Sequence, residues 1–191
     1  MPWLVIWRII AMKSKSFVVD FKSKVETRGG RLIIKLPPAA SSQLPSRGQV
    51  AVRGAINGSD FQTVIEPDGG KGHWINVSEK LKSDTDIRAG SDVSIKIGPA
   101  KSWPEPEVPR DLKSALSDDP EISEMWLDIT PMARWEWVRW IGATPNPQTR
   151  QRRVYVTISK MRGGKRRPCC FDLASCTDPE LSKSGKLLGI K

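Results

Sequence analysis

Short runs of β-forming residues, separated by turn residues, fill residues 17–97 and constrain the fold more than any other feature of the chain. Two such runs, residues 49–56 and 61–65, flank Asn57-Gly58, the dipeptide most typical of a tight hairpin. Four further runs have the same character: Phe17–Lys22, Arg31–Leu36, His73–Val77 and Val93–Ile97. Residues 78–83 predict a helical turn. Six or so short strands with Gly, Pro and Asn between them predict a small closed β-barrel.

The pattern changes at residues 99–109, a segment with four prolines. Prolines at this density remove backbone donors and favour an extended linker. Beyond it, three dipeptides pair a helix-capping residue with proline: Asp119-Pro120, Thr130-Pro131 and Asn146-Pro147. They predict three helices, after an earlier one over Arg110–Leu116: Pro120–Asp128, Pro131–Ile141 and Pro147–Arg162. The predicted fold class is α+β, a small closed β-barrel of about six strands followed by a short helical region.

On this interpretation the chain has five parts: an N-terminal extension (1–16), a β-barrel domain (17–98), a linker (99–109), a helical region (110–164) and a basic, Cys-containing tail (165–191). Arg8 interrupts the apolar run of the extension, which is shorter than the ~20 residues that a spanning helix needs. No basic segment precedes that run, as one would in a signal peptide. We therefore expect no membrane span. A mis-called start, with Met12 as the real first residue, explains the extension, and an interfacial anchor is the alternative. The tail has little periodicity, so we expect it to pack loosely or to be partly disordered.

The charge of the chain is strongly positive and unevenly distributed. Lys and Arg number 31 against 21 Asp and Glu, a formal net charge of +10. Such a surface attracts nucleic acid, anionic lipid or an acidic protein, although net charge alone also serves solubility. Residues 105–128 hold eight acids, whereas residues 146–171 hold no acid and eight bases: Arg150, Arg152, Arg153, Lys160, Arg162, Lys165, Arg166 and Arg167.

Spacing along the last predicted helix divides these bases into two groups. Val154, Ile158 and Met161 lie at helical spacing and predict the buried stripe. Arg150 and Arg153 lie at its edge, so we expect both to form ion pairs with the acidic helices, for example with Asp128; the alternative acceptor is an external anion. We expect the exposed basic face to consist of Arg152, Lys165, Arg166 and Arg167.

Three of the eight tryptophans lie between residues 135 and 141. Trp137 and Trp140 share a helical face with Ile141, while Trp135 lies apart. Aromatic stripes of this kind usually bury, which predicts packing against the barrel. The alternative is a stacking platform for bases or a flat ligand, with arginines at its rim.

His73 is the single histidine and follows the glycine-rich segment 69–72. Backbone N–H groups of that segment are compatible with anion binding, and equally with a tight hairpin. Any nucleophile activated by histidine has to involve His73. A Cys₃His metal set of Cys169, Cys170, Cys176 and His73 lacks the usual ligand spacing, so we predict no metal and no cofactor. The odd number of crowded cysteines favours reduced thiols and a cytoplasmic location.

Several spaced segments resemble known bacterial families. Arg47–Gly58, Phe61–Thr63, Gly69–Ile75 and Ala89–Val93 together resemble a small bacterial β-barrel domain of unknown function. Val108–Leu112, Trp140-Ile141 and Thr149–Arg153 resemble the YdeI/OmpD-associated, or bacteriocin-protection, family. The resemblance implies a closed barrel and a non-catalytic role, and it transfers no catalytic residue. Residues 143–147 depart from the family pattern, in which an Ala-Lys pair precedes the Thr-Arg segment.

These observations predict a non-enzymatic binding or stress-protection protein, whose ligand meets the basic helix and the barrel mouth. The partner is an acidic protein or a small ligand, and the oligomeric state stays open. One alternative is a nucleic-acid-binding module that uses the basic helix and the barrel face. A second is an enzyme that uses His73. The candidate binding residues are Arg47, Arg53, His73, Trp74, Trp137, Trp140, Arg150, Arg152, Arg153, Lys165, Arg166 and Arg167.

The extension before Lys13 is expected to be dispensable, because it fits no targeting signal. A chain that begins at Met12 should melt within ~5 °C of the full chain when thermal unfolding is followed by circular dichroism. A larger fall in melting temperature would show that the extension packs against the folded protein.

Overall fold

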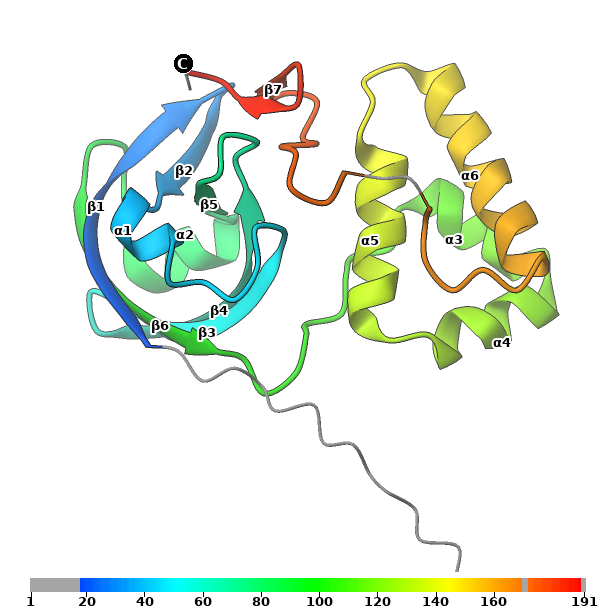
Figure 1. The fold of residues 1–191 in the computed structure, drawn as a ribbon, viewed down its shortest axis with the longest axis horizontal. Coiled ribbons are helices and arrows are strands. Elements are labelled where there is room, and N and C mark those ends of the chain that lie inside the picture. Colours follow the sequence, from blue (N-terminus) through cyan, green and yellow to red (C-terminus); the bar gives the residue numbers. More distant parts are fainter. Residues whose placement is uncertain (1–17, 170–171, 190–191) are drawn as a thin grey trace, which may run out of the picture.

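A computed structural model describes residues 18–169 and 172–189. The predicted extension and Cys170 lie outside these residues. A β-barrel and a bundle of helices stand side by side, joined by the linker and by the C-terminal part of the chain (Figure 1). Within the described residues, no helix has the length and apolar character needed to cross a membrane.

The first unit is a closed barrel of antiparallel strands in the order β1-β2-β5-β4-β3-β6, as predicted. The strands are β1 (Val19–Arg28), β2 (Arg31–Lys35), β3 (Val50–Ile56), β4 (Ser59–Pro67), β5 (His73–Asn76) and β6 (Asp92–Pro99). The β3–β4 hairpin turns at Asn57 and Gly58, with φ angles of 50° and 88°. Two consecutive positive φ angles are what a type I′ turn requires, which explains this dipeptide.

Strand β1 is longer than predicted, because it pairs with two neighbours in succession. Its first half, from Val19 to Lys24, pairs with β6, and residues from Val25 to Arg28 pair with β2. The second half carries only one buried hydrophobic residue, Val25, so its sequence gives a weak strand signal. This shared strand closes the barrel.

Alternation along the strands fills the barrel with branched apolar side chains. Ile34, Val52, Ile56, Ile65 and Ile75 are completely or almost completely buried in one cluster. Two short helices, α1 (Pro38–Ser41) and α2 (Glu79–Thr85), contribute Ala40 and Leu81 to the same cluster. The barrel interior is therefore a packed core.

The second unit consists of α3 (Arg110–Ser117), α4 (Pro120–Asp128), α5 (Pro131–Gly142) and α6 (Pro147–Arg162). The predicted caps are confirmed: the side chains of Asp119, Thr130 and Asn146 each accept a backbone N–H in the first turn of α4, α5 and α6. The predicted stripe of α6 is also buried, in one cluster with the apolar faces of α3, α4 and α5.

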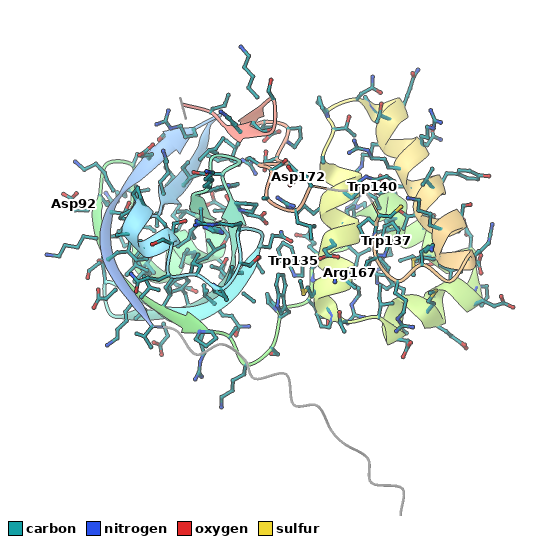
Figure 2. All side chains as sticks on the ribbon, in the orientation of Figure 1. Asp92, Trp135, Trp137, Trp140, Arg167 and Asp172 are labelled. Atoms are coloured by element: carbon teal, nitrogen blue, oxygen red, sulfur yellow. The ribbon has the colours of Figure 1, made fainter. Side chains whose placement is uncertain are left out.

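Trp137 and Ile141 belong to this helical core and are completely buried there. The expectation that their face packs against the barrel is therefore wrong. The barrel instead lies on the side of α5 that carries Trp135, as Figure 2 shows. The linker is fixed to the same helix, because Arg134 pairs with Glu105 and Trp135 Nε1 donates to the Pro104 carbonyl at 2.8 Å.

Residues 172–189, which we term the C-terminal strap, return from the helical unit to the barrel (Figure 1). The strap ends in a small hairpin of β7 (Ser182–Lys183) and β8 (Lys186–Leu187). Cys176, Leu181 and Leu187 are buried against Ile33 and Trp74 on the outside of the barrel. The predicted loose tail is therefore wrong for these residues. Three isolated apolar side chains produce no periodic signal, and only the barrel wall shows what they contact.

Removing the Leu181 side chain tests whether the strap is an integral part of the fold. Leu181 is 0% exposed, so Leu181→Ala should lower the free energy of unfolding by about 2–4 kcal/mol in urea denaturation. Leu127 is 77% exposed and provides the control, since Leu127→Ala should change the free energy of unfolding by less than ~0.5 kcal/mol. Equal, small effects of both changes would mean that the strap is not held against the barrel.

Candidate ligand-binding site

A pocket of about 350 Å³ lies where the barrel, α5 and the C-terminal strap meet. The barrel contributes the ends of β4 and β5, including Glu66 and Trp74. Helix α5 contributes Trp135 and Arg139, and the strap contributes residues 176–179. Segments far apart in the sequence therefore form one site.

Strand and helix periodicity explain how these side chains reach the pocket. Glu66 on β4 lies opposite Trp74 on β5, so both side chains are on the outer face of the barrel, while Ile65 and Ile75 point into its core. On α5, pocket residues recur at positions 135, 138, 139 and 142, the spacing of one helical face. This second stripe of α5 was the sequence signal for the site, and the interpretation of residues 135–141 by their buried tryptophans missed it.

A buried ion pair forms one wall of the pocket. Arg139 Nε lies 3.2 Å from Glu66 Oε2, and the two side chains are 6% and 19% exposed. Glu66 Oε1 also accepts from Gln49 Nε2 at 2.6 Å. Arg139 donates to two strap carbonyls, those of Leu173 at 3.3 Å and Ser175 at 2.5 Å. Burial raises the pKa of Glu66, and the Arg139 charge opposes this shift.

A second ion pair lies on the strap side. Asp178 pairs with Arg31 of β2, and its Oδ1 accepts backbone N–H groups of Glu180 and Leu181 at 3.1 and 3.2 Å. Cys176 is buried beside it, and burial raises the pKa of its thiol to about 11. The thiol is therefore protonated at neutral pH. Both carboxylates of the pocket, Glu66 and Asp178, already have an arginine partner.

His73 is placed in the barrel wall and does not line this pocket. It is 0% exposed. Its Nε2 lies 3.1 Å from the Gly48 carbonyl, which can only accept, so Nε2 carries the proton and donates. Nδ1 then accepts from the Ser41 hydroxyl at 2.6 Å. The interpretation of His73 as a ligand contact is wrong, because both ring nitrogens are used inside the protein.

The glycine-rich loop beside His73 binds its own carboxylate. Asp68 is buried, and its Oδ1 accepts N–H groups of Gly70 and Gly72 at 2.7 and 2.8 Å. At Gly69, with φ +74°, a Cβ would lie 1.9 Å from the Gly185 carbonyl of the strap. The glycines therefore permit close approach of the strap, and the anion-binding interpretation of this loop is wrong.

The two candidate arginines of the barrel do not reach this pocket. Arg47 is exposed and donates to the Lys71 carbonyl at 2.8 Å, at the rim of the glycine loop. Arg53 is exposed on β3, beside another shallow hollow formed by β3, β4 and β6.

Four of the eight basic residues in segment 146–171 have acidic partners. Arg150 pairs with Asp111 at 2.6 Å, which confirms its predicted ion pair with a different partner from the one suggested. Arg162 pairs with Asp119 at 2.7 Å. Arg166 and Arg167, predicted to form an exposed basic face, are exposed but pair with Asp128 and Glu136. All four residues of the predicted face, including Arg152 and Lys165, are exposed as expected, whereas the acidic partners of Arg166 and Arg167 were not predicted.

Arg153 and Lys160 instead cover Trp140. They lie 5.5 and 5.7 Å from the centre of its ring, and Arg153 Nη1 donates to the Trp140 carbonyl at 2.7 Å. The predicted ion pair of Arg153 is therefore wrong. Trp140 also packs edge to face with Trp137 at 6.0 Å. Because two cations and a second indole cover the ring, Trp140 is not an open stacking platform.

Trp137 and Trp74 are both buried, and their indole N–H groups donate to the carbonyls of Arg166 at 3.2 Å and Pro67 at 3.1 Å. Trp137 is a core residue of the helical unit. Trp74 is the one aromatic candidate that lines the pocket between the units.

Within residues 18–169 and 172–189, no group of three or more His, Cys, Asp or Glu side chains could hold a metal ion. Cys176 packs with Ile33 and Trp74, whereas Cys169 is exposed, with Sγ 2.9 Å from Lys160 Nζ. Cys170 lies outside the described residues. The three described members of the Cys₃His set, Cys169, Cys176 and His73, therefore do not come together as metal ligands.

Two family models match the chain. Residues 105–164, the helical unit with part of the linker, match the family described as Bacteriocin-protection, YdeI or OmpD-Associated. Residues 21–97, the barrel, match a domain of unknown function, DUF1905. No curated protein matches the chain. The matches confirm both resemblances, and residues 172–189 lie beyond them.

The buried histidine predicts a pH dependence of stability. Burial lowers the pKa of His73 below its ordinary value of 6.5, so the unfolded chain takes up a proton in a range where the folded protein does not. The free energy of unfolding should therefore fall as the pH is lowered from about 8 to about 5.5, and His73→Gln should reduce this slope.

Ser41→Ala provides the control, because it removes one hydrogen bond and retains the titrating ring. This variant should be less stable at both pH values and should keep most of the pH dependence. If urea denaturation gives the same slope for the wild type and His73→Gln, the ring is accessible to protons in the folded state.

Proposed function

We propose that this protein is a non-catalytic binding protein that holds a small ligand in the pocket between the barrel and the helical unit. The observation that carries the proposal is the convergence of three segments on one hollow of about 350 Å³. Junctions between structural units are preferred positions for ligand sites, and this volume lies in the usual range for them. The mostly apolar wall, with a few polar groups, is also typical of such sites.

The chemistry of the reactive side chains supports a binding role. His73 is buried with both ring nitrogens engaged, so it is poorly placed to exchange protons with a substrate. The Cys176 thiol, with its pKa raised to about 11, is a weak nucleophile at neutral pH. Glu66 and Asp178 are already engaged in ion pairs with Arg139 and Arg31. These features oppose the alternative of an enzyme that uses His73.

The nucleic-acid alternative draws less support from the structure than from the sequence. Arg150, Arg162, Arg166 and Arg167 each pair with an acid of the helical unit. Phosphate binding at these positions has to compete with an internal carboxylate. We therefore place the ligand in the pocket and not on α6. We propose that this binding serves the bacteriocin-protection role named in the family description. We also propose that the protein acts in the cytoplasm.

Trp135 provides the test, because it lines the pocket and Trp103 of the linker does not. Small molecules extracted from the natively purified protein should be identified by mass spectrometry and returned to the protein in titrations followed by calorimetry. Trp135→Ala should weaken binding of the recovered compound by at least about tenfold, since stacking on an aromatic ring contributes about 1–3 kcal/mol. Trp103→Ala should bind it like the wild type.

Thermal unfolding of both variants shows whether each remains folded. A compound whose binding is unaffected by Trp135→Ala and is lost on changing Arg152 and Lys165 to Ala would place the site on the basic surface and contradict the proposal.

A further inference from the structure

We infer that the pocket selects an uncharged ligand that combines an apolar ring face with hydroxyl or amide groups, as a sugar or a nucleoside does. This inference rests on the proposed function and specifies the ligand of the same site. It follows from which charges of the pocket are already neutralised and which polar groups remain.

The charged wall of the pocket is neutral as a unit. Glu66 accepts from Gln49 and pairs with Arg139, and Arg139 also donates to the carbonyls of Leu173 and Ser175. An anionic ligand would have to displace Glu66 from the guanidinium. A cationic ligand would have to compete with that guanidinium for Glu66.

The strap side is neutralised in the same way. The Asp178 carboxylate pairs with Arg31 and accepts two backbone N–H groups, so its charge is compensated from both sides. A charged ligand would therefore lose its hydration on entering the pocket without gaining an unpaired counter-charge. That cost disfavours both signs of charge.

The remaining polar side chains of the pocket are uncharged. They include Asn76 on the outer face of β5, next in the alternation to Trp74, and Thr177 of the strap. An amide and a hydroxyl both donate and accept hydrogen bonds, so they match ligand hydroxyl or amide groups in either role. Neither can compensate a full charge as an ion pair does.

The aromatic wall offers ring faces and no polar edge. Trp135 Nε1 donates to the Pro104 carbonyl and Trp74 Nε1 to the Pro67 carbonyl, at 2.8 and 3.1 Å. With the N–H groups engaged, the surface that a ligand meets is apolar: Trp135 and Val138 are half-buried and supply it, whereas Trp74 and Val64 are buried behind them. Such surface packs well against the C–H face of a sugar ring or the flat face of a base.

Matched probes of different charge test the inference. The sugar series is glucose, glucosamine and glucose 6-phosphate, and the nucleoside series is adenosine and adenosine monophosphate. Saturation-transfer NMR and calorimetry with the full chain should show binding of a neutral member at least about tenfold tighter than that of its charged derivatives. The series that binds identifies the ligand as sugar or nucleoside. Asn76→Ala and Trp135→Ala should both weaken the binding.

Glu66→Gln adds a test of the neutralisation itself. This change keeps the shape of the side chain and leaves the Arg139 charge uncompensated, so the anionic member should gain affinity relative to the neutral one. The matched control is Glu121→Gln, since Glu121 is exposed at the start of α4 and does not line the pocket.

The outcomes separate the two proposals. Tightest binding of a charged probe that depends on Trp135 would overturn the inference and leave the binding function intact. Absence of Trp135-dependent binding for every probe would count against both. An unchanged charge preference in Glu66→Gln would show that the ion pair does not set the selectivity.

Discussion

The buried ion pair between Glu66 and Arg139 is the interaction on which the arrangement of the whole molecule depends. Glu66 belongs to the barrel, Arg139 to α5, and the carbonyls that complete the arginine's hydrogen bonds belong to the strap. A buried pair compensates its loss of hydration only where the geometry and the additional hydrogen bonds are good. Displacing any of the three segments would leave a charge buried without its partner. The pair therefore contributes to fixing the position of the two units more than to total stability.

The same interaction shapes the candidate site. Because the ion pair and its partners hold the strap across the junction, the hollow between barrel and α5 is closed on one side by residues 176–179. The apolar contacts of Leu181 and Leu187 with the barrel then fix the far end of the strap. Neither family match includes the strap, although it supplies a wall of the pocket. The properties of the pocket thus arise from the combination of barrel, helices and strap.

The fold was largely predictable, because its signals are local. Alternation gave the strands, and capping residues followed by proline gave the starts of α4, α5 and α6. The site was not predictable in the same way, since it depends on which faces meet. Trp135 lies outside the stripe of α5 that packs into the helical core. The sequence does not show which segment contacts such an outward-facing stripe, and here the barrel and the strap do. The strap had too few apolar residues to give a periodic pattern.

Charge and reactive residue types were the least reliable guides, for one physical reason. A polar group that is buried must find a partner, so internal hydrogen bonds engage Asp68 and His73, and the buried Glu136 pairs with Arg167. A sequence shows which charges exist and not which are already neutralised. Basic residues of α6 and of the loop after it form ion pairs with acids of the helical unit. The net charge of +10 therefore overstates the positive potential near α6. In the pocket the charges cancel, and uncharged groups such as Asn76 and Thr177 are available to a ligand. The pocket is therefore a better candidate for the binding site than the basic surface.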